Sequence, residues 1–165
     1  MRQIRKNVFE TNSSSTHSFT VCSPYRQNSY LAVDAEGYAL ANMNGFCSCE
    51  TYTSQEDKLG YILQLLGYTL NYSFNCDCSR LQTVLEEFYE SAEFKAIEAE
   101  ILDYVKETDP EAAHCIGIRF NDYSSYGYID DGYDYDSLED FLDFHSTTLI
   151  DFIFGNNMLH YEYNG

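Results

Sequence analysis

The segment from Arg5 to His17 holds residue types that could handle a phosphate group. Hydroxyls and backbone amides suit the phosphate oxygens, a cation balances their charge, and an imidazole can transfer a proton. Such a site would suit a metal-independent ribonuclease or another phosphate-handling enzyme. The alternative is a hydroxyl-rich turn that satisfies backbone groups ahead of a strand. The candidate catalytic residues are Arg5, Ser13, Ser14, Thr16 and His17.

Proton transfer by this segment would need a general acid as well as a general base. His114, His145 and His160 are the other histidines of the chain, and each could accompany His17. Their separation in sequence does not show which of them lies near it. The residues therefore leave open whether the protein is an enzyme.

Two Cys-x-Cys pairs form the candidate metal site. Residues two apart on an extended segment face the same way, so two such pairs could form a tetrahedral thiolate site for zinc. Zinc knuckles usually separate their ligands by two to four residues, however, and a free cysteine is also a good small core residue. We therefore favour buried thiols and no cofactor, with zinc as the alternative. The ligands would be Cys47, Cys49, Cys76 and Cys78.

Carboxylates interleaved with tyrosines form the strongest pattern in the sequence that could indicate a partner-binding surface. The chain carries 9 Lys plus Arg against 27 Asp plus Glu, a formal net charge of −18, which repels phosphate backbones and anionic membranes. Carboxylates can instead pair with the cations of a nucleic-acid-binding protein, while tyrosines supply rigid contact area. The alternative is a solvated acidic surface. The candidate partner-binding residues are Glu86, Glu87, Glu90, Glu93, Asp130, Asp131, Tyr133, Asp134, Tyr135 and Asp136.

The start of the sequence and its apolar runs bear on the compartment. Residues 1–6 carry cations, but residues 7–18 are polar where a signal peptide needs an apolar region. No apolar run approaches the roughly 20 residues that span a bilayer. We therefore expect a cytoplasmic protein without a membrane partner, whose 6 cysteines are not paired in disulfides.

The chain length and the helix and strand patterns around these groups predict one α+β domain over all 165 residues. Helical periodicity predicts a helix over residues 54–66, capped by Ser54. It also predicts one long acidic helix over residues 79–107, or two joined at a break near Ser91. Two to three shorter helices are expected, one of them capped by Ser137 and another over residues 147–154.

Strand-like patterns predict a mixed or antiparallel sheet. Residues 115–120 and 126–129 are expected to pair with each other, and residues 158–163 to form an edge strand. The remaining predicted strands are residues 17–22, 30–33, 38–40 and 68–74.

The opening sequence RKNVFETNSSSTHS, residues 5–18, resembles the start of small proteins encoded by phages and mobile elements of Firmicutes. The sequence LIDFIF at residues 149–154 is similar too. The resemblance implies the class of anti-defence factors, which includes anti-CRISPR proteins. Some proteins of that class imitate nucleic acid, and others are enzymes that act on the guide RNA or on the effector.

Charge and resemblance together favour an anti-CRISPR inhibitor in the cytoplasm of an infected bacterial host. Its acidic, Tyr-rich face would bind the basic nucleic-acid-binding surface of a host protein, with a CRISPR effector and its guide RNA as the leading partner. Direct binding to free nucleic acid is not expected. The first alternative is a guide-RNA nuclease that uses the segment around His17. The second is a phage structural or regulatory protein without enzymatic activity.

Overall fold

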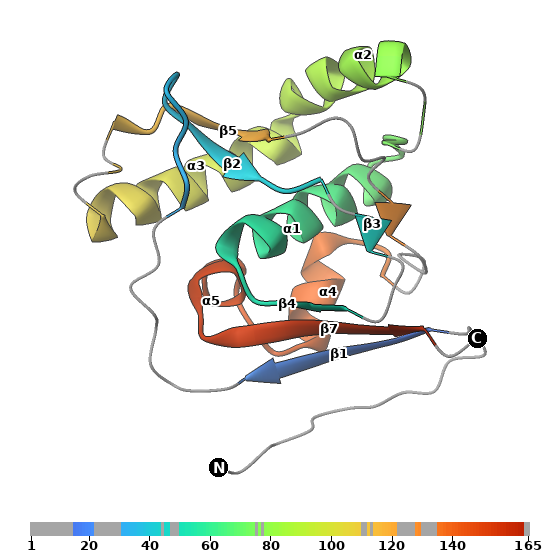
Figure 1. The fold of residues 1–165 in the computed structure, drawn as a ribbon. Coiled ribbons are helices and arrows are strands. Elements are labelled where there is room, and N and C mark those ends of the chain that lie inside the picture. Colours follow the sequence, from blue (N-terminus) through green and yellow to red (C-terminus); the bar gives the residue numbers. More distant parts are fainter. Residues whose placement is uncertain are drawn as a thin grey trace.

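The computed structural model describes the chain in several ranges separated by short gaps. These ranges are residues 15–21, 31–43, 45–46, 50–74, 76, 78–109, 112, 114–121, 128–129 and 135–163. Within them the chain forms helices and both parallel and antiparallel strand pairs (Figure 1). The predicted α+β class is confirmed.

The largest sheet has three antiparallel strands in the order β1-β7-β4. Strand β7 (Asn157–Tyr163) lies in the centre, β1 (Ser15–Val21) pairs with it along its whole length, and β4 (Glu50–Tyr52) flanks its other side. The prediction of an edge strand at residues 158–163 was therefore wrong. Both neighbours of β7 come from the first third of the chain, and no local pattern reports such distant pairing.

Two further strand pairs are parallel. Strand β2 (Tyr38–Ala41) pairs with β5 (Gly117–Phe120), and β3 (Gly45–Phe46) pairs with β6 (Tyr128–Ile129). The predicted pairing of residues 115–120 with residues 126–129 was therefore wrong. A parallel pair needs a long crossover, and three helices supply it between β2 and β5.

Helix α1 (Gln55–Thr69) lies in the middle of the molecule, with the antiparallel sheet on one side and the β2–β5 pair on the other (Figure 1). The Ser54 side chain caps it by accepting a hydrogen bond from the Asp57 N–H at 3.1 Å. Every residue from Lys58 to Gly67 is buried, as expected for a helix that is apolar all round. The helix runs to Thr69 and residues 70–74 form no strand, so the strand predicted at residues 68–74 was wrong.

A close backbone crossing fixes α1 against the end of β2. A Cβ atom at Gly60 would lie 1.8 Å from the carbonyl oxygen of Asn42, so only glycine fits there. The Asn42 N–H also donates to the Glu56 carbonyl at 2.9 Å. These contacts set the position of the β2–β5 pair on the central helix.

Helices α2 (Cys78–Tyr89) and α3 (Ala92–Thr108) follow one another along the side of the molecule away from the antiparallel sheet (Figure 1). Ser91 caps α3 by accepting from the Phe94 N–H at 3.2 Å, and its hydroxyl donates to the Phe88 carbonyl at 2.7 Å. The predicted break near Ser91 is confirmed.

Two short helices complete the fold: α4 (Leu138–Phe144), capped by Ser137, and α5 (Leu149–Phe154), capped by Thr148. They pack against α1 from the side of the antiparallel sheet. Phe141 and Phe152 are fully buried there, with ring centroids 5.5 Å and 6.2 Å from that of Tyr61. No helix in the described ranges is long and apolar enough to cross a membrane.

Candidate functional site

The predicted phosphate site lies mostly beyond the described part of the chain. Arg5, Ser13 and Ser14 are outside the described residues. Thr16 and His17 belong to β1, where they lie opposite Glu162 and Tyr161 of β7.

The other histidines do not form a pair with His17 in the strand register. His160 of β7 lies opposite Ser18, one position along from His17, and successive strand positions alternate between the two faces of a sheet. His114 is exposed beyond the end of α3. His145 ends α4, where its Nε2 lies 3.1 Å from the hydroxyl of Tyr135. The register thus supplies no second histidine opposite His17.

Tyr135 corrects the expected partner-binding surface. It was expected to contact a partner, but only 8% of it is exposed, and its ring packs edge-on against Phe141 at 5.1 Å between centroids. A large ring that is packed inside the fold in this way is not available for contact with a partner. Asp136 next to it is exposed. The candidates Asp130, Asp131, Tyr133 and Asp134 lie outside the described residues.

The cysteine pairs are described only in part. Cys47 and Cys49 lie outside the described residues, Cys76 is a half-buried free thiol, and Cys78 is the first residue of α2. Across the described ranges, no three His, Cys, Asp or Glu side chains are grouped to hold a metal ion. The zinc hypothesis stays a prediction because two of its four ligands fall outside those ranges.

Exposed carboxylates line α2 and α3, and we call this surface the α2–α3 acidic face. Glu93, Glu100 and Glu107 are seven residues apart, so they lie on one stripe of α3 at intervals of about 10 Å. At 1.5 Å per residue, α2 is about 18 Å long and α3 about 25 Å. The face consists of Glu86, Glu87, Glu90, Glu93, Glu100, Asp103 and Glu107, all exposed.

Few cations neutralise the α2–α3 acidic face. Lys95 forms an ion pair with Glu90, but the two side chains are 51% and 78% exposed, and exposed pairs contribute little stability. Lys106 makes no ion pair within the described structure. Within the same ranges, five of the carboxylates accept no hydrogen bond and pair with no cation: Glu87, Glu93, Glu100, Asp103 and Glu107.

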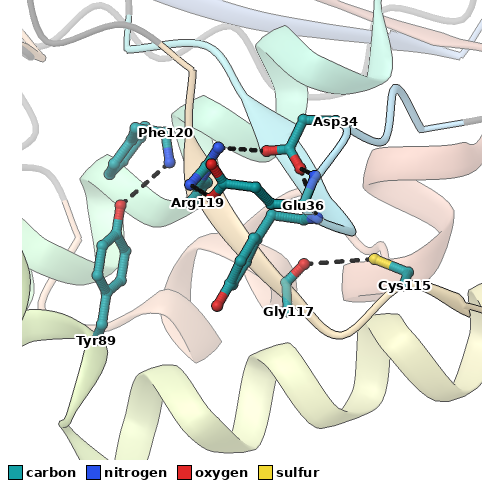
Figure 2. Close-up of polar contacts among 8 residues, drawn as sticks. Asp34, Glu36, Tyr89, Cys115, Gly117, Arg119 and Phe120 are labelled. Atoms are coloured by element: carbon teal, nitrogen blue, oxygen red, sulfur yellow. Dashed lines mark hydrogen bonds and ion pairs between the residues drawn. The ribbon is translucent and has the colours of Figure 1, made fainter.

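Arg119 of β5 shows the opposite arrangement, with two carboxylates on one guanidinium (Figure 2). It lies 2.7 Å from Asp34 and 2.7 Å from Glu36, and its Cζ is 4.9 Å from the ring centroid of Tyr38. Desolvation alone would raise the pKa of Asp34. Backbone N–H donors from Tyr38 and Glu36 and the charge of Arg119 outweigh it, so the pKa is lowered. The cluster ties the turn before β2 to β5.

Lys58 is a fully buried cation in the first turns of α1. Its Nζ donates a hydrogen bond to the Gly155 carbonyl at 2.9 Å, which connects α1 to the turn between α5 and β7. Burial lowers the pKa of Lys58 from 10.5 to about 8. Sequence reasoning missed this residue, although a lysine inside an otherwise apolar helical run was a visible signal.

No protein-family model matches this chain, and no curated protein or solved structure is significantly similar to it. In the described part of the chain, α2 and α3 carry the exposed carboxylates of the α2–α3 acidic face, five of which have no partner there. Chemically, such a surface can bind cations or the basic side chains of a partner.

Proposed function

We propose that this protein is an inhibitor that binds a basic, nucleic-acid-binding surface of another protein through its α2–α3 acidic face. A CRISPR effector loaded with guide RNA is the leading partner, as the phage-like opening of the sequence implies. The observation that carries the proposal is the set of unpaired, exposed carboxylates on two consecutive helices.

Pairing with the cations of a partner would satisfy these carboxylates, which the described part of the chain leaves without one. Arginine and lysine side chains that hold a phosphate backbone can hold carboxylates by the same charge-assisted hydrogen bonds. Complementary charge also speeds the encounter between partners, and added salt weakens that attraction. The proposed complex should therefore form fast at low salt and weaken steeply as salt is added.

The first test is a cleavage assay with a guide-loaded CRISPR nuclease, in which target DNA and guide RNA are both followed on denaturing gels. Occlusion by the acidic face predicts blocked DNA cleavage and an intact guide. A shortened guide would contradict the proposal and favour the ribonuclease alternative around His17. Normal cleavage without complex formation would contradict inhibition of that nuclease.

The second test compares two charge-reversal variants with the same change in net charge. Glu100→Lys with Glu107→Lys alters the stripe on α3, whereas Glu139→Lys with Asp143→Lys alters exposed residues of α4. Opposing two cations of a partner should weaken binding by about 100-fold in the α3 variant. The α4 variant should stay within a few-fold of the unaltered protein. Equal losses in both variants would mean that overall charge, and not this face, governs binding.

A further inference from the structure

The outer edge of β5 is closed by side chains instead of by another strand. One side of β5 pairs with β2. On the other side, the N–H of Ile118 donates to Glu98 Oε1 at 2.8 Å, and the N–H of Phe120 donates to the hydroxyl of Tyr89 at 3.1 Å. Figure 2 shows the second contact. An exposed strand edge leaves such donors unpaired, so these side chains stand in for the acceptors of a missing strand.

Glu98 differs from the carboxylates of the α2–α3 acidic face although it lies on the same helix. It is half-buried, and its Oε1 would lie 3.0 Å from a Cβ atom placed on Gly117. The absence of a side chain at Gly117 thus leaves the space that the carboxylate occupies. Glu98 acts here as a hydrogen-bond acceptor for main chain, while Glu100 is exposed and has no partner among the described residues.

The two attachments lie on either side of the break between the helices. Tyr89 is the last residue of α2, and its ring lies 5.0 Å from that of Phe94 in the first turn of α3. Glu98 lies one turn further along α3. Because Ser91 interrupts the helix between them, each helix has its own hydrogen bond to β5.

We infer that Glu98 and Tyr89 are positioning residues that fix α2 and α3 on β5 and so set the orientation of the α2–α3 acidic face toward its partner. This inference rests on the proposed function. In this role Glu98 matters as a hydrogen-bond acceptor and not as a charge. Glu93, Glu100 and Glu107, by contrast, would act through their charge.

Three variants of the full chain test this role with the guide-loaded CRISPR nuclease as the probe. Glu98→Gln keeps an acceptor oxygen and removes the charge, so its affinity should stay within about twofold of the unaltered protein. Glu98→Ala removes the acceptor, and Tyr89→Phe removes the hydroxyl. Each should bind about tenfold more weakly, the size of one lost hydrogen bond. Weakening by Glu98→Gln equal to that by Glu98→Ala would overturn the inference and make Glu98 a charged contact.

Amide hydrogen exchange on the free protein supplies a measurement that needs no partner. The Ile118 amide should exchange faster in Glu98→Ala but not in Glu98→Gln, and the Phe120 amide should exchange faster in Tyr89→Phe. Faster exchange with unchanged affinity would overturn the positioning role while leaving the proposed function intact. No binding by the unaltered protein would instead refute the proposed function, and the positioning role would fall with it.

Discussion

At Arg119 one guanidinium holds two carboxylates, whereas most carboxylates of the α2–α3 acidic face have no cation within the described structure. The Arg119 side chain is 34% exposed and Asp34 only 16%, so this pairing takes place partly out of water. Glu93, Glu100 and Glu107 of α3 are exposed. The ion pairs at Arg119 thus join two elements of the fold, whereas the carboxylates of the α2–α3 acidic face are exposed and, apart from Glu90, pair with no cation in the described part of the chain.

The buried cation Lys58 also joins two elements of the fold. Lys58 connects α1 to Gly155, as Arg119 connects β5 to the turn before β2. The chain has 9 Lys plus Arg, and these two have structural positions. The carboxylates of the α2–α3 acidic face, by contrast, are exposed.

Removing the guanidinium gives the largest expected effect on the folded protein. Arg119→Met leaves Asp34 with backbone donors alone and removes the stacking on Tyr38. The melting temperature should fall by about 3–6 °C, because a partly buried carboxylate loses its counter-charge. Thermal unfolding followed by circular dichroism measures this change.

The matched control for Arg119 is Lys95, the cation of the exposed pair with Glu90. Lys95→Met should change the free energy of unfolding by less than about 0.5 kcal/mol. Equal melting temperatures for the two variants would contradict the expected difference between the partly buried ion pairs of Arg119 and the exposed pair of Lys95 with Glu90.

Raising the pH should stabilise the protein through Lys58. Its pKa is about 8 in the folded chain and 10.5 unfolded, so between these values the unfolded chain binds more protons and stability rises with pH. From pH 7.5 to 9 the gain should be about 1 kcal/mol. Urea unfolding at both pH values measures it.

Lys58→Met isolates the contribution of this group from other groups that titrate in the same range. The variant should lack the rise of about 1 kcal/mol. An equal pH dependence in the variant would show that Lys58 is not the titrating group.

Neutralising the exposed stripe should have the smallest effect on folding. Glu100→Gln with Glu107→Gln should leave the free energy of unfolding unchanged or raise it by at most about 0.5 kcal/mol, because these carboxylates have no partner in the described ranges. Urea unfolding checks this, and the same variant should bind the guide-loaded nuclease more weakly. A clear loss of stability would show that the stripe has a structural role after all.

Local signals predicted the helices well. Ser54, Ser91, Ser137 and Thr148 each cap a helix through a hydrogen bond from the backbone three residues later. Such caps depend on neighbours within one turn, so short stretches of sequence carry the information. The α+β class followed from these helices together with the strand patterns.

Strand pairing and burial could not be predicted in the same way. The partner of residues 117–120 is residues 38–41, and three helices separate them in the chain. Tyr135 looked like an exposed contact because the residues before it are acidic, but it is buried and its ring packs against Phe141 of α4. The role of Glu98 depends on a backbone 20 residues away, which helical periodicity does not reveal.

The seven-residue spacing of Glu93, Glu100 and Glu107 also governs how strongly these charges feel one another. At physiological salt, electrostatic interactions in water fade over about 8 Å, which is less than the interval of about 10 Å along the helix. Each of Glu93, Glu100 and Glu107 is therefore largely screened from the next one on the stripe, whereas Asp103 lies three and four residues from Glu100 and Glu107 and is repelled by both at closer range. A partner that displaces the water would meet each of these charges unscreened. Its affinity should therefore decline in steps as the three glutamates are neutralised one after another by mutation.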